Sequence, residues 1–243
     1  MYNKVVFAAL SAVLIPAFAH AFRLSPMVVQ FAPHGNKATQ VLLLENQGSE
    51  KVPVQIEVFA RSADAKGEEV RTKTDDFVVY PEQVVLLPGE KRNVRVTWSA
   101  DLKGPDEQAY RIVASQLPVK FKEKNSAPQN QNVNLNFLLQ YVASAYVVPE
   151  GAKAQVRVKE VKRIDAKKVS LLLANEGTAH KVLKAKSLSF YSGDKLLLEM
   201  ATVKEFENVN LLPKSQKTLI VAVPKDVSGA NLRAEISLLE TGD

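Results

Sequence analysis

The side chains that most often carry enzymatic chemistry are few and poorly spaced in this sequence. There is no cysteine, which excludes a thiol nucleophile and cysteine-ligated metals. Past residue 21 only His34 and His180 remain, and neither has a second histidine at metal-ligand spacing. The acidic pairs Glu68-Glu69 and Asp75-Asp76 are adjacent residues, which point to opposite faces of a strand. We therefore expect neither an enzyme nor a metal or cofactor site.

The charge pattern indicates a solvated surface. The net charge is +6, but basic residues are mixed with acidic ones, as in Lys66-Gly67-Glu68-Glu69 and Glu90-Lys91-Arg92. Aromatic residues do not interleave with the basic ones, and no phosphate-binding glycine loop or G-x-S-x-G motif is present. We expect neither a nucleic acid nor a small-molecule substrate as a partner, although a basic surface can help to dock an acidic one.

The pattern with the clearest binding chemistry is an alternation of apolar and polar residues near the middle of the chain. Read as a β-strand, it places five apolar side chains on one face: Val133, Leu135, Phe137, Leu139 and Tyr141. The polar segment 122–132 before it cannot form a core of its own. Such a strand either completes the protein's own sheet or is offered to another chain, and the residues alone leave both readings open.

The first 21 residues have the three parts of a secretory signal. Lys4 is followed by the apolar run Val5–Phe18 and by the small-residue site Ala19-His20-Ala21. The run is too short for a comfortable membrane span. We expect residues 1–21 to be a signal peptide that is cleaved after Ala21, so that the mature protein is exported.

Short segments rich in β-branched and aromatic residues fill the rest of the chain, and turn residues separate them. Before residue 148 the expected strands are Val41–Leu44, Val52–Phe59, Phe77–Tyr80, Val84–Leu87, Val94–Trp98 and Tyr110–Leu117, followed by a long strand over 132–148. After Pro149-Glu150-Gly151 they are Ala154–Val161, Val169–Ala174, Leu188–Tyr191, Lys195–Leu198, Thr218–Val223 and Ala234–Leu239. The pattern predicts an all-β protein of two sandwiches in series, covering 22–148 and 149–243.

The two halves also share a weak internal similarity. Leu44-Glu45-Asn46 with Gly48 in the first half matches Leu173-Ala174-Asn175 with Gly177 in the second. The similarity suggests that the two domains have related folds.

The sequence resembles the periplasmic pilus-assembly chaperones of the chaperone–usher pathway, the PapD-like proteins. The order and spacing of several segments carry the resemblance, together with the alternating strand and its stop at Pro149: Leu24–Val29, Tyr80–Val96, Tyr110–Pro118, Asn175-Glu176-Gly177 and Leu211-Leu212-Pro213. It covers the whole mature sequence.

The resemblance implies a fold and a function. The fold is two immunoglobulin-like sandwiches set at an angle, like a boomerang. The function is a periplasmic chaperone that holds pilus, fimbrial or spore-coat-type fibre subunits by donor-strand complementation and delivers them to an outer-membrane usher. Val133, Leu135, Phe137 and Leu139 would be the donor residues, with Tyr141 on the same face. The unloaded protein could also self-associate.

One departure from the best-known branch of the family concerns the subunit's terminal carboxylate. That branch holds the carboxylate with an arginine and a lysine, but the matching positions here are Met27 or Val28, and Ser144. This absence, with the segment Tyr110–Ala114, favours the archaic branch. We therefore expect Arg111 to be the carboxylate anchor, because an arginine can bind a carboxylate with two parallel hydrogen bonds. An internal salt bridge to a residue such as Glu150 is the alternative.

Two lesser candidates for the anchor are Arg95 and Arg23. A different class of protein is also open: an exported two-domain immunoglobulin-like adhesin or fibre subunit. Such a subunit would more often have one incomplete sandwich and a free N-terminal donor peptide, whereas here the mature N-terminus, Phe22–Val29, starts directly in a strand.

Overall fold

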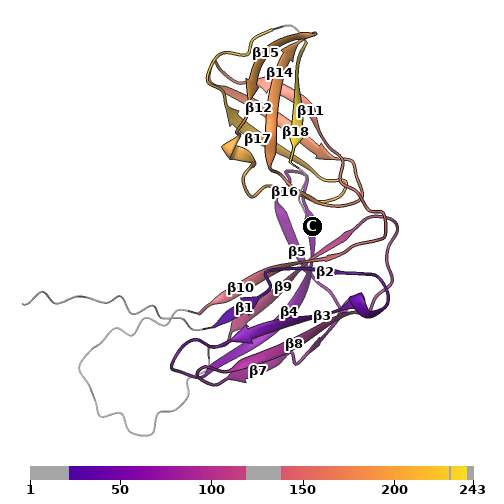
Figure 1. The fold of residues 1–243 in the computed structure, drawn as a ribbon, viewed down its shortest axis with the longest axis vertical. Helices are drawn as coiled ribbons and strands as arrows, with labels where there is room; N and C mark the ends of the chain where they lie inside the picture. Colours follow the sequence, from indigo (N-terminus) through magenta and orange to yellow (C-terminus); the bar gives the residue numbers. More distant parts are fainter. Residues whose placement is uncertain (1–21, 119–137, 230, 240–243) are drawn as a thin grey trace, which may run out of the picture.

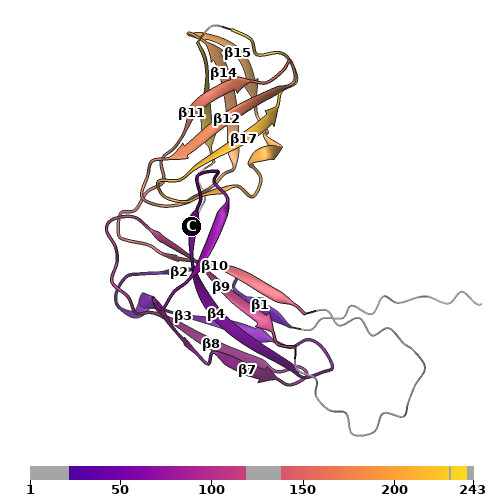
Figure 2. The same cartoon turned by 180° about the vertical axis from the view of Figure 1, so that it is seen from behind.

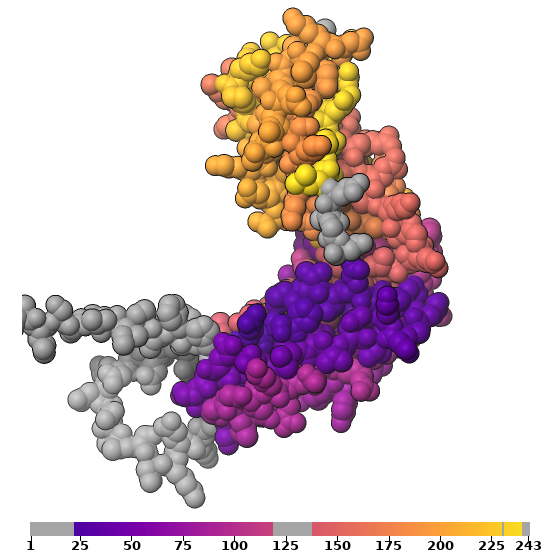
Figure 3. All heavy atoms as spheres, viewed as in Figure 1, coloured from indigo at the N-terminus to yellow at the C-terminus, as the bar shows by residue number. Residues whose placement is uncertain are grey.

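The computed structural model describes residues 22–118, 138–229 and 231–239. These residues form strands and two short 3-10 helices, η1 (Asn36–Ala38) and η2 (Lys204–Phe206). They fold into two lobes that meet at an angle, so the molecule is bent (Figure 1, and from behind in Figure 2). The bend is also visible in the space-filling view (Figure 3). Within the described ranges no helix has the length and apolarity needed to span a bilayer.

The first lobe is a sandwich of two sheets. One sheet has the order β1-β3-β8-β6, with β1 (Arg23–Ser25), β3 (Thr39–Glu45), β8 (Lys91–Trp98) and β6 (Phe77–Tyr80). The other has the order β2-β10-β9-β4-β5, with β7 paired to β4; its strands are β2 (Val28–Phe31), β10 (Gln140–Val147), β9 (Gln108–Gln116), β4 (Val52–Ala63), β5 (Glu69–Lys73) and β7 (Gln83–Leu86). Except in β5, whose residues are all exposed, alternate residues of the strands, such as Val54, Ile56 and Val58 of β4, fill a shared core.

The second lobe has its own core around Leu171, Phe190 and Val221. Its strands lie in the orders β11-β12-β17, β15-β14-β18 and β13-β16. They are β11 (Val156–Arg163), β12 (Lys168–Asn175), β13 (Lys181–Val182), β14 (Ala185–Ser192), β15 (Lys195–Met200), β16 (Asn210–Leu211), β17 (Gln216–Ala222) and β18 (Leu232–Leu238). The prediction of an all-β protein with two sandwiches in series is thus confirmed.

Each segment expected as a strand within the described ranges contains one. The N-terminal segment Phe22–Val29, expected to start in a strand, contains β1 and the start of the separate strand β2, and the strands β5, β13 and β16 were not expected. The long strand over 132–148 is described only from residue 138, and β10 begins at Gln140. The proposed signal peptide, residues 1–21, lies outside the described residues.

The lobes contact each other through a small mixed interface. Ala109, Tyr146, Val148 and Leu212 form an apolar cluster between them. Beside it, the backbone N–H of Glu107 donates to the carbonyl of Thr178 over 2.8 Å. The hairpin between β4 and β5 extends from the first lobe to the second (Figure 1), where Lys217 donates to the carbonyl of Gly67 over 3.1 Å.

Candidate functional site

The described end of the alternating segment, from residue 138, leads into β10. Val133, Leu135 and Phe137 lie outside the described residues, so their role stays a prediction. Leu139 and Tyr141 are described, and both are half-buried against the first core. The ring of Tyr141 packs edge-on against Phe22 at 5.0 Å between ring centroids.

Burial along this face decreases toward the N-terminal end of β10. Val147, Ala145 and Ala143 are fully buried, whereas Tyr141 and Leu139 are only half-buried. These residues share one face because they alternate along a strand. The core of the first lobe therefore covers the C-terminal part of the apolar face completely and the N-terminal part only in part.

The two edges of β10 are paired unequally. Along its whole length β10 pairs antiparallel with β9. On its other edge it pairs parallel with β2, from Ser144 opposite Val28 to Val147 opposite Phe31. In the described part of the chain no strand pairs with this second edge at Gln140–Ala143, so its backbone groups can accept another strand.

Arg111 lies where this open edge ends. In the sheet register it is the partner of Ser144 on β10 and of Phe59 on β4. Its Nη1 donates to Ser144 Oγ over 2.5 Å. The side chain lies on the outer face of the sheet, because the neighbouring pair Ile112 and Ala143 faces the core. The guanidinium of Arg111 thus lies at Ser144, the position that matches the basic anchor residue described in the sequence analysis and that is a serine in this chain.

The guanidinium of Arg111 also binds Glu69 of β5. Its Nη2 lies 2.5 Å from Glu69 Oε2, and its Nε lies 3.1 Å from each carboxylate oxygen. The sequence offered Glu150 as an internal partner for Arg111, but the structure shows Glu69 in that place.

Two further arginines surround the same carboxylate. Arg71 Nε donates to Glu69 Oε1 over 2.6 Å, and Arg61 Nε lies 2.8 Å from Oε2. We call Arg61, Arg71, Arg111 and Glu69 the arginine cluster. Burial alone would raise the pKa of the Glu69 carboxyl, but hydrogen bonds from Arg111 and Arg71 and the charge of Arg61 outweigh it and lower the pKa to about 2.

Three members of the arginine cluster were not among the expected site residues, although the sequence contains one signal for them. Ala65-Lys66-Gly67 are turn residues, and a chain folded about them has Arg61 opposite Arg71, which is the register observed. Like charges directly opposite are unfavourable in a sheet unless an anion lies between them.

The arginine cluster borders a cavity between the lobes of about 280 Å³. Its lining includes Arg61, Arg111 and Glu69 from the first lobe and Asn210 and Lys217 from the second. The β4–β5 hairpin therefore forms one wall of an interlobe cavity that contains carboxylate-binding groups.

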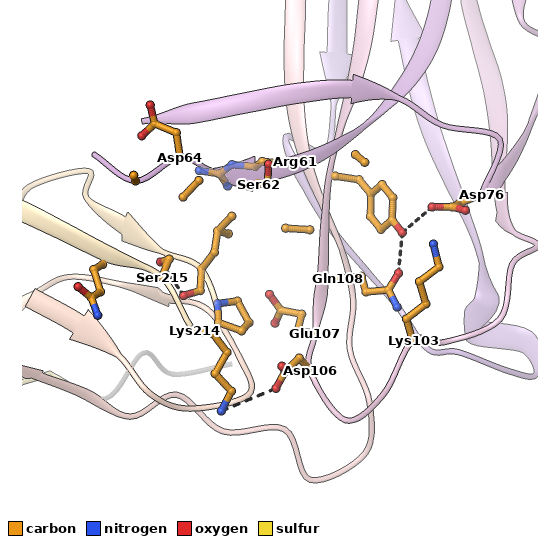
Figure 4. Close-up of a pocket in the computed structure, with 18 residues that line it drawn as sticks. Arg61, Ser62, Asp64, Asp76, Lys103, Asp106, Glu107, Gln108, Lys214 and Ser215 are labelled. Atoms are coloured by element: carbon orange, nitrogen blue, oxygen red, sulfur yellow. Dashed lines mark hydrogen bonds and ion pairs between the residues drawn. The ribbon is translucent and has the colours of Figure 1, made fainter. Parts of the chain in front are cut away.

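A larger neighbouring cavity, of about 630 Å³, shares Arg61 and Leu212 with the first. Figure 4 shows Arg61 on one side of it and Lys214 and Ser215 of the second lobe on the other. Tyr110 and Asp76 also line this cavity, and the Tyr110 hydroxyl donates to Asp76 Oδ2 over 2.9 Å. Burial, together with this hydrogen bond, raises the pKa of Tyr110.

Arg95 and Arg23 lie in the other sheet of the first lobe, on β8 and β1, and both are exposed. Arg95 is the sheet partner of Val41 and Tyr80, and Arg23 is that of Glu45. Of the three candidate anchors, only Arg111 lies on a strand that pairs with β10.

His180 lies in the loop between β12 and β13 but is largely shielded from solvent. Its side chain is only 17% exposed. Its Nδ1 lies 2.7 and 2.9 Å from the two carboxylate oxygens of the buried Glu107, and its ring stacks on Tyr146 at 3.8 Å. The contact between the lobes removes His180 from solvent, which a local sequence pattern does not show. Among the described residues no cluster of metal-binding side chains is found.

These features define a class, a two-lobed all-β protein with an open strand edge beside a carboxylate-binding cluster. A model of the pili and flagellar-assembly chaperones, for the PapD N-terminal domain, matches residues 22–153. The chain belongs to this family of non-enzymatic assembly chaperones. The resemblance to PapD-like chaperones of the chaperone–usher pathway is thereby confirmed.

Solved structures with the same two-lobed, immunoglobulin-like fold include three from bacteria. The archaic chaperone–tip subunit complex CsuC–CsuE of Acinetobacter baumannii is 19% identical, with a TM-score of 0.58 over 88% of this chain and 97% of that one. The Escherichia coli chaperone DraB is 17% identical, with a TM-score of 0.54 over 91% and 99%. The Salmonella enterica SafA pilin–SafB chaperone complex is 16% identical, with a TM-score of 0.51 over 90% and 96%. No curated protein matches the chain.

Proposed function

We propose that this protein is a periplasmic chaperone that captures fibre subunits by donor-strand complementation and passes them to an outer-membrane usher. The observation that carries the proposal is β10, whose apolar face is only half covered by the core at Leu139 and Tyr141, while in the described part of the chain no strand pairs with one edge at Gln140–Ala143. A subunit that lacks a strand can pair with this edge and cover the apolar face.

Similar structures give further support. One is described as a complex of a chaperone with a tip adhesion subunit, and another as a pilin in complex with its chaperone. We expect this chain to hold a subunit in the same way, with residues 1–21 as the export signal, 22–148 as the domain that carries the donor strand and 149–243 as the second domain.

The donor residues can supply substantial binding energy. Burying each apolar side chain of Val133, Leu135, Phe137 and Leu139 contributes about 1.5–3 kcal/mol before ordering and association costs. Backbone pairing sets the register, because a shift by one residue would turn the intervening polar side chains inward. No nucleotide is needed if a better-packed strand from the next subunit replaces the donor strand.

The position of Arg111 supports the proposal that it holds the subunit's last residue. The open edge of β10 ends at Ser144, and the Arg111 guanidinium contacts that side chain. A subunit strand whose C-terminus lies at Ser144 runs parallel to β10, as β2 does beyond that point. Its terminal carboxylate then meets Arg111, which can bind it with two parallel hydrogen bonds.

The donor residues are tested by charge substitution. We expect Leu135→Asp or Phe137→Asp to abolish capture of a strand-deficient subunit co-expressed in the periplasm, because a buried carboxylate without a partner is costly. Capture is measured by co-purification and mass spectrometry. Asn136→Asp adds the same charge to the polar face and should leave capture intact. If the two apolar variants became insoluble instead, these positions would be ordinary core.

The carboxylate anchor is tested by Arg111→Ala. We expect the yield of the subunit complex to fall at least about tenfold, since a charge-assisted bidentate contact of roughly 1.5–3 kcal/mol is lost. The control is Arg95→Ala, which removes an exposed arginine from the other sheet. An unchanged yield with Arg111→Ala would exclude Arg111 as the anchor.

A further inference from the structure

We infer that Glu69 is an internal occupant of the carboxylate-binding site, which the subunit's terminal carboxylate must displace from Arg111. This inference rests on the proposed function, because it names what fills the anchor in the empty protein. It adds to that proposal a competition between two carboxylates, one built into the β4–β5 hairpin and one at the end of the guest chain.

The first observation is how the arginine cluster holds Glu69. Three guanidinium groups approach one carboxylate, with N···O distances of 2.5 Å for Arg111, 2.6 Å for Arg71 and 2.8 Å for Arg61. Arg111 uses its Nε and Nη2 together, as it would for a free carboxylate. A guest carboxylate directed to Arg111 therefore finds the two donors that it needs already engaged.

The second observation is that the cluster contains more positive charge than Glu69 can satisfy. Three arginines share one carboxylate, and Arg61 lies directly opposite Arg71 in the sheet. The side chain of Arg61 is only 9% exposed. Its Nε is close enough to Glu69 for an ion pair but has no hydrogen-bond partner among the described residues. A buried, incompletely satisfied guanidinium favours the binding of an additional anion.

The third observation is the cavity of about 280 Å³ beside the cluster. Its other charged lining groups, Glu68 and Lys217, pair with each other over 3.1 Å. On the side of the second lobe the amide oxygen of Asn210 is buried without a hydrogen-bond partner in the described structure. This polar cavity next to two arginines suits the carboxylate and last residue of a peptide.

Glu69 lies on an exposed strand at the edge of its sheet. Within the described residues β5 pairs only with β4, and all five of its residues are exposed. The carboxylate can therefore leave the arginines without disturbing the core. Protonation cannot release it under ordinary conditions, because its pKa lies near 2, so a second carboxylate is needed.

The inference is tested by the binding of acetate to the full-length protein. The Arg Nε–Hε signals in NMR spectra report directly on the guanidinium groups, and acetamide serves as the uncharged control ligand. If Glu69 fills the site about nine-tenths of the time, Glu69→Gln should bind acetate about tenfold more tightly than the wild type. Arg111→Ala in the Glu69→Gln background should abolish this gain.

Glu90→Gln is the matched control. Glu90 pairs with Arg92 over 2.6 Å, as Glu69 does with Arg71, but it lines neither of the two cavities, so acetate affinity should stay at the wild-type value. If Glu69→Gln bound acetate no more tightly than the wild type, the inference would be wrong. Weaker binding would also overturn it, and would make Glu69 a residue that merely orients Arg111.

The outcome can be separated from that of the proposed function. The acetate experiment uses no subunit, whereas strand donation is judged by Leu135→Asp and Phe137→Asp. If the acetate prediction fails, the inference that Glu69 is an internal occupant is wrong, but the proposal of strand donation is unaffected. Strand donation could fail while Glu69→Gln still bound acetate more tightly. Glu69 would then occupy an anion site, but the statement that a subunit's terminal carboxylate displaces it would be wrong.

Discussion

Two buried asparagines show how a single residue can hold equivalent turns in both lobes. Asn46 donates to the carbonyls of Glu50, Leu86 and Leu87 and accepts from the N–H of Gly48. Asn175 does the same in the second lobe, where its amide donates to Ala179 and Leu211 and its oxygen accepts from Gly177. The weak similarity around these residues in the sequence therefore has a structural cause, since each asparagine satisfies backbone groups that would otherwise be buried unpaired.

The arginine cluster marks the limit of sequence reasoning at the same scale. Arg111 could be singled out, because it lies in a recognisable segment and carries a fixed charge. Glu69 could not, because it reaches Arg111 through the pairing of β4 with both β5 and β9. Such a neighbour depends on the register of three strands, and its own segment is so exposed that no hydrophobic pattern marks it as a strand.

Glu69 also makes stability depend on pH. Its pKa is about 2 in the folded protein against an ordinary value of 4.5. The ionised carboxylate is favoured in the folded state, so its stabilisation is present above pH 4.5 and is lost as the pH falls toward 2. We expect Glu69→Gln to lose less stability than the wild type between roughly pH 6 and pH 3. Urea unfolding midpoints measure this, with Glu68→Gln as the control. Parallel losses in wild type and Glu69→Gln would contradict the expectation.

Among the elements, β10 was predicted as a strand with one apolar face, but its boundaries were not predicted. Alternation of apolar residues correctly placed Leu139 and Tyr141 on one face. It could not show that this face passes gradually from full to half burial, because burial depends on where the opposite sheet ends. The sequence also left open whether these residues complete their own core or bind a guest, and at Leu139 and Tyr141 the structure shows partial packing on the first lobe.

The β4–β5 hairpin depends on a glycine at its tip. Gly67 has a φ of +79°, and a Cβ there would lie 2.5 Å from the carbonyl oxygen of Gln216 in the second lobe. Gly67→Ala should therefore add a clash between the lobes to the cost of a left-handed residue, which is about 1–2 kcal/mol. We expect a lower unfolding midpoint and a changed radius of gyration by small-angle X-ray scattering.

Gly89→Ala separates these two effects. Gly89 has a similar φ of +71°, but a Cβ at this position meets nothing within 4 Å. It should lower stability without changing the overall dimensions of the molecule. The same behaviour in both variants would mean that the hairpin tip yields freely and does not restrain the second lobe.

For the molecule as a whole, two sandwiches could be predicted from the spacing of strands and the break at Pro149, whereas their contact could not. Glu107 and His180 are 73 positions apart in the chain, and neither residue type indicates a buried partner. Tyr146 joins the same group, since it stacks on His180 and its hydroxyl accepts from Asn210 over 2.7 Å. Polar contacts between distant segments leave no periodic signal in the sequence.

This polar group should help to fix the angle between the lobes. His180→Ala leaves the buried Glu107 carboxylate without its side-chain partner, which should cost about 1–3 kcal/mol. We expect a lower urea midpoint and a broader distribution of lobe angles in solution scattering. His34→Ala, an exposed histidine in the first lobe, is the control. A His180→Ala protein that was as stable and as compact as the wild type would show that the apolar cluster alone holds the lobes.

The β4–β5 hairpin links the binding of a guest at the arginine cluster to the contact between the two lobes. Only Glu68 stands between Glu69, which touches the arginines, and Gly67, which touches Lys217 of the second lobe. A guest that draws Glu69 away therefore pulls on the element that spans the bend. We therefore expect the binding of a guest to change the orientation of the second lobe relative to the first. Such a change is detectable at a surface that does not contact the guest.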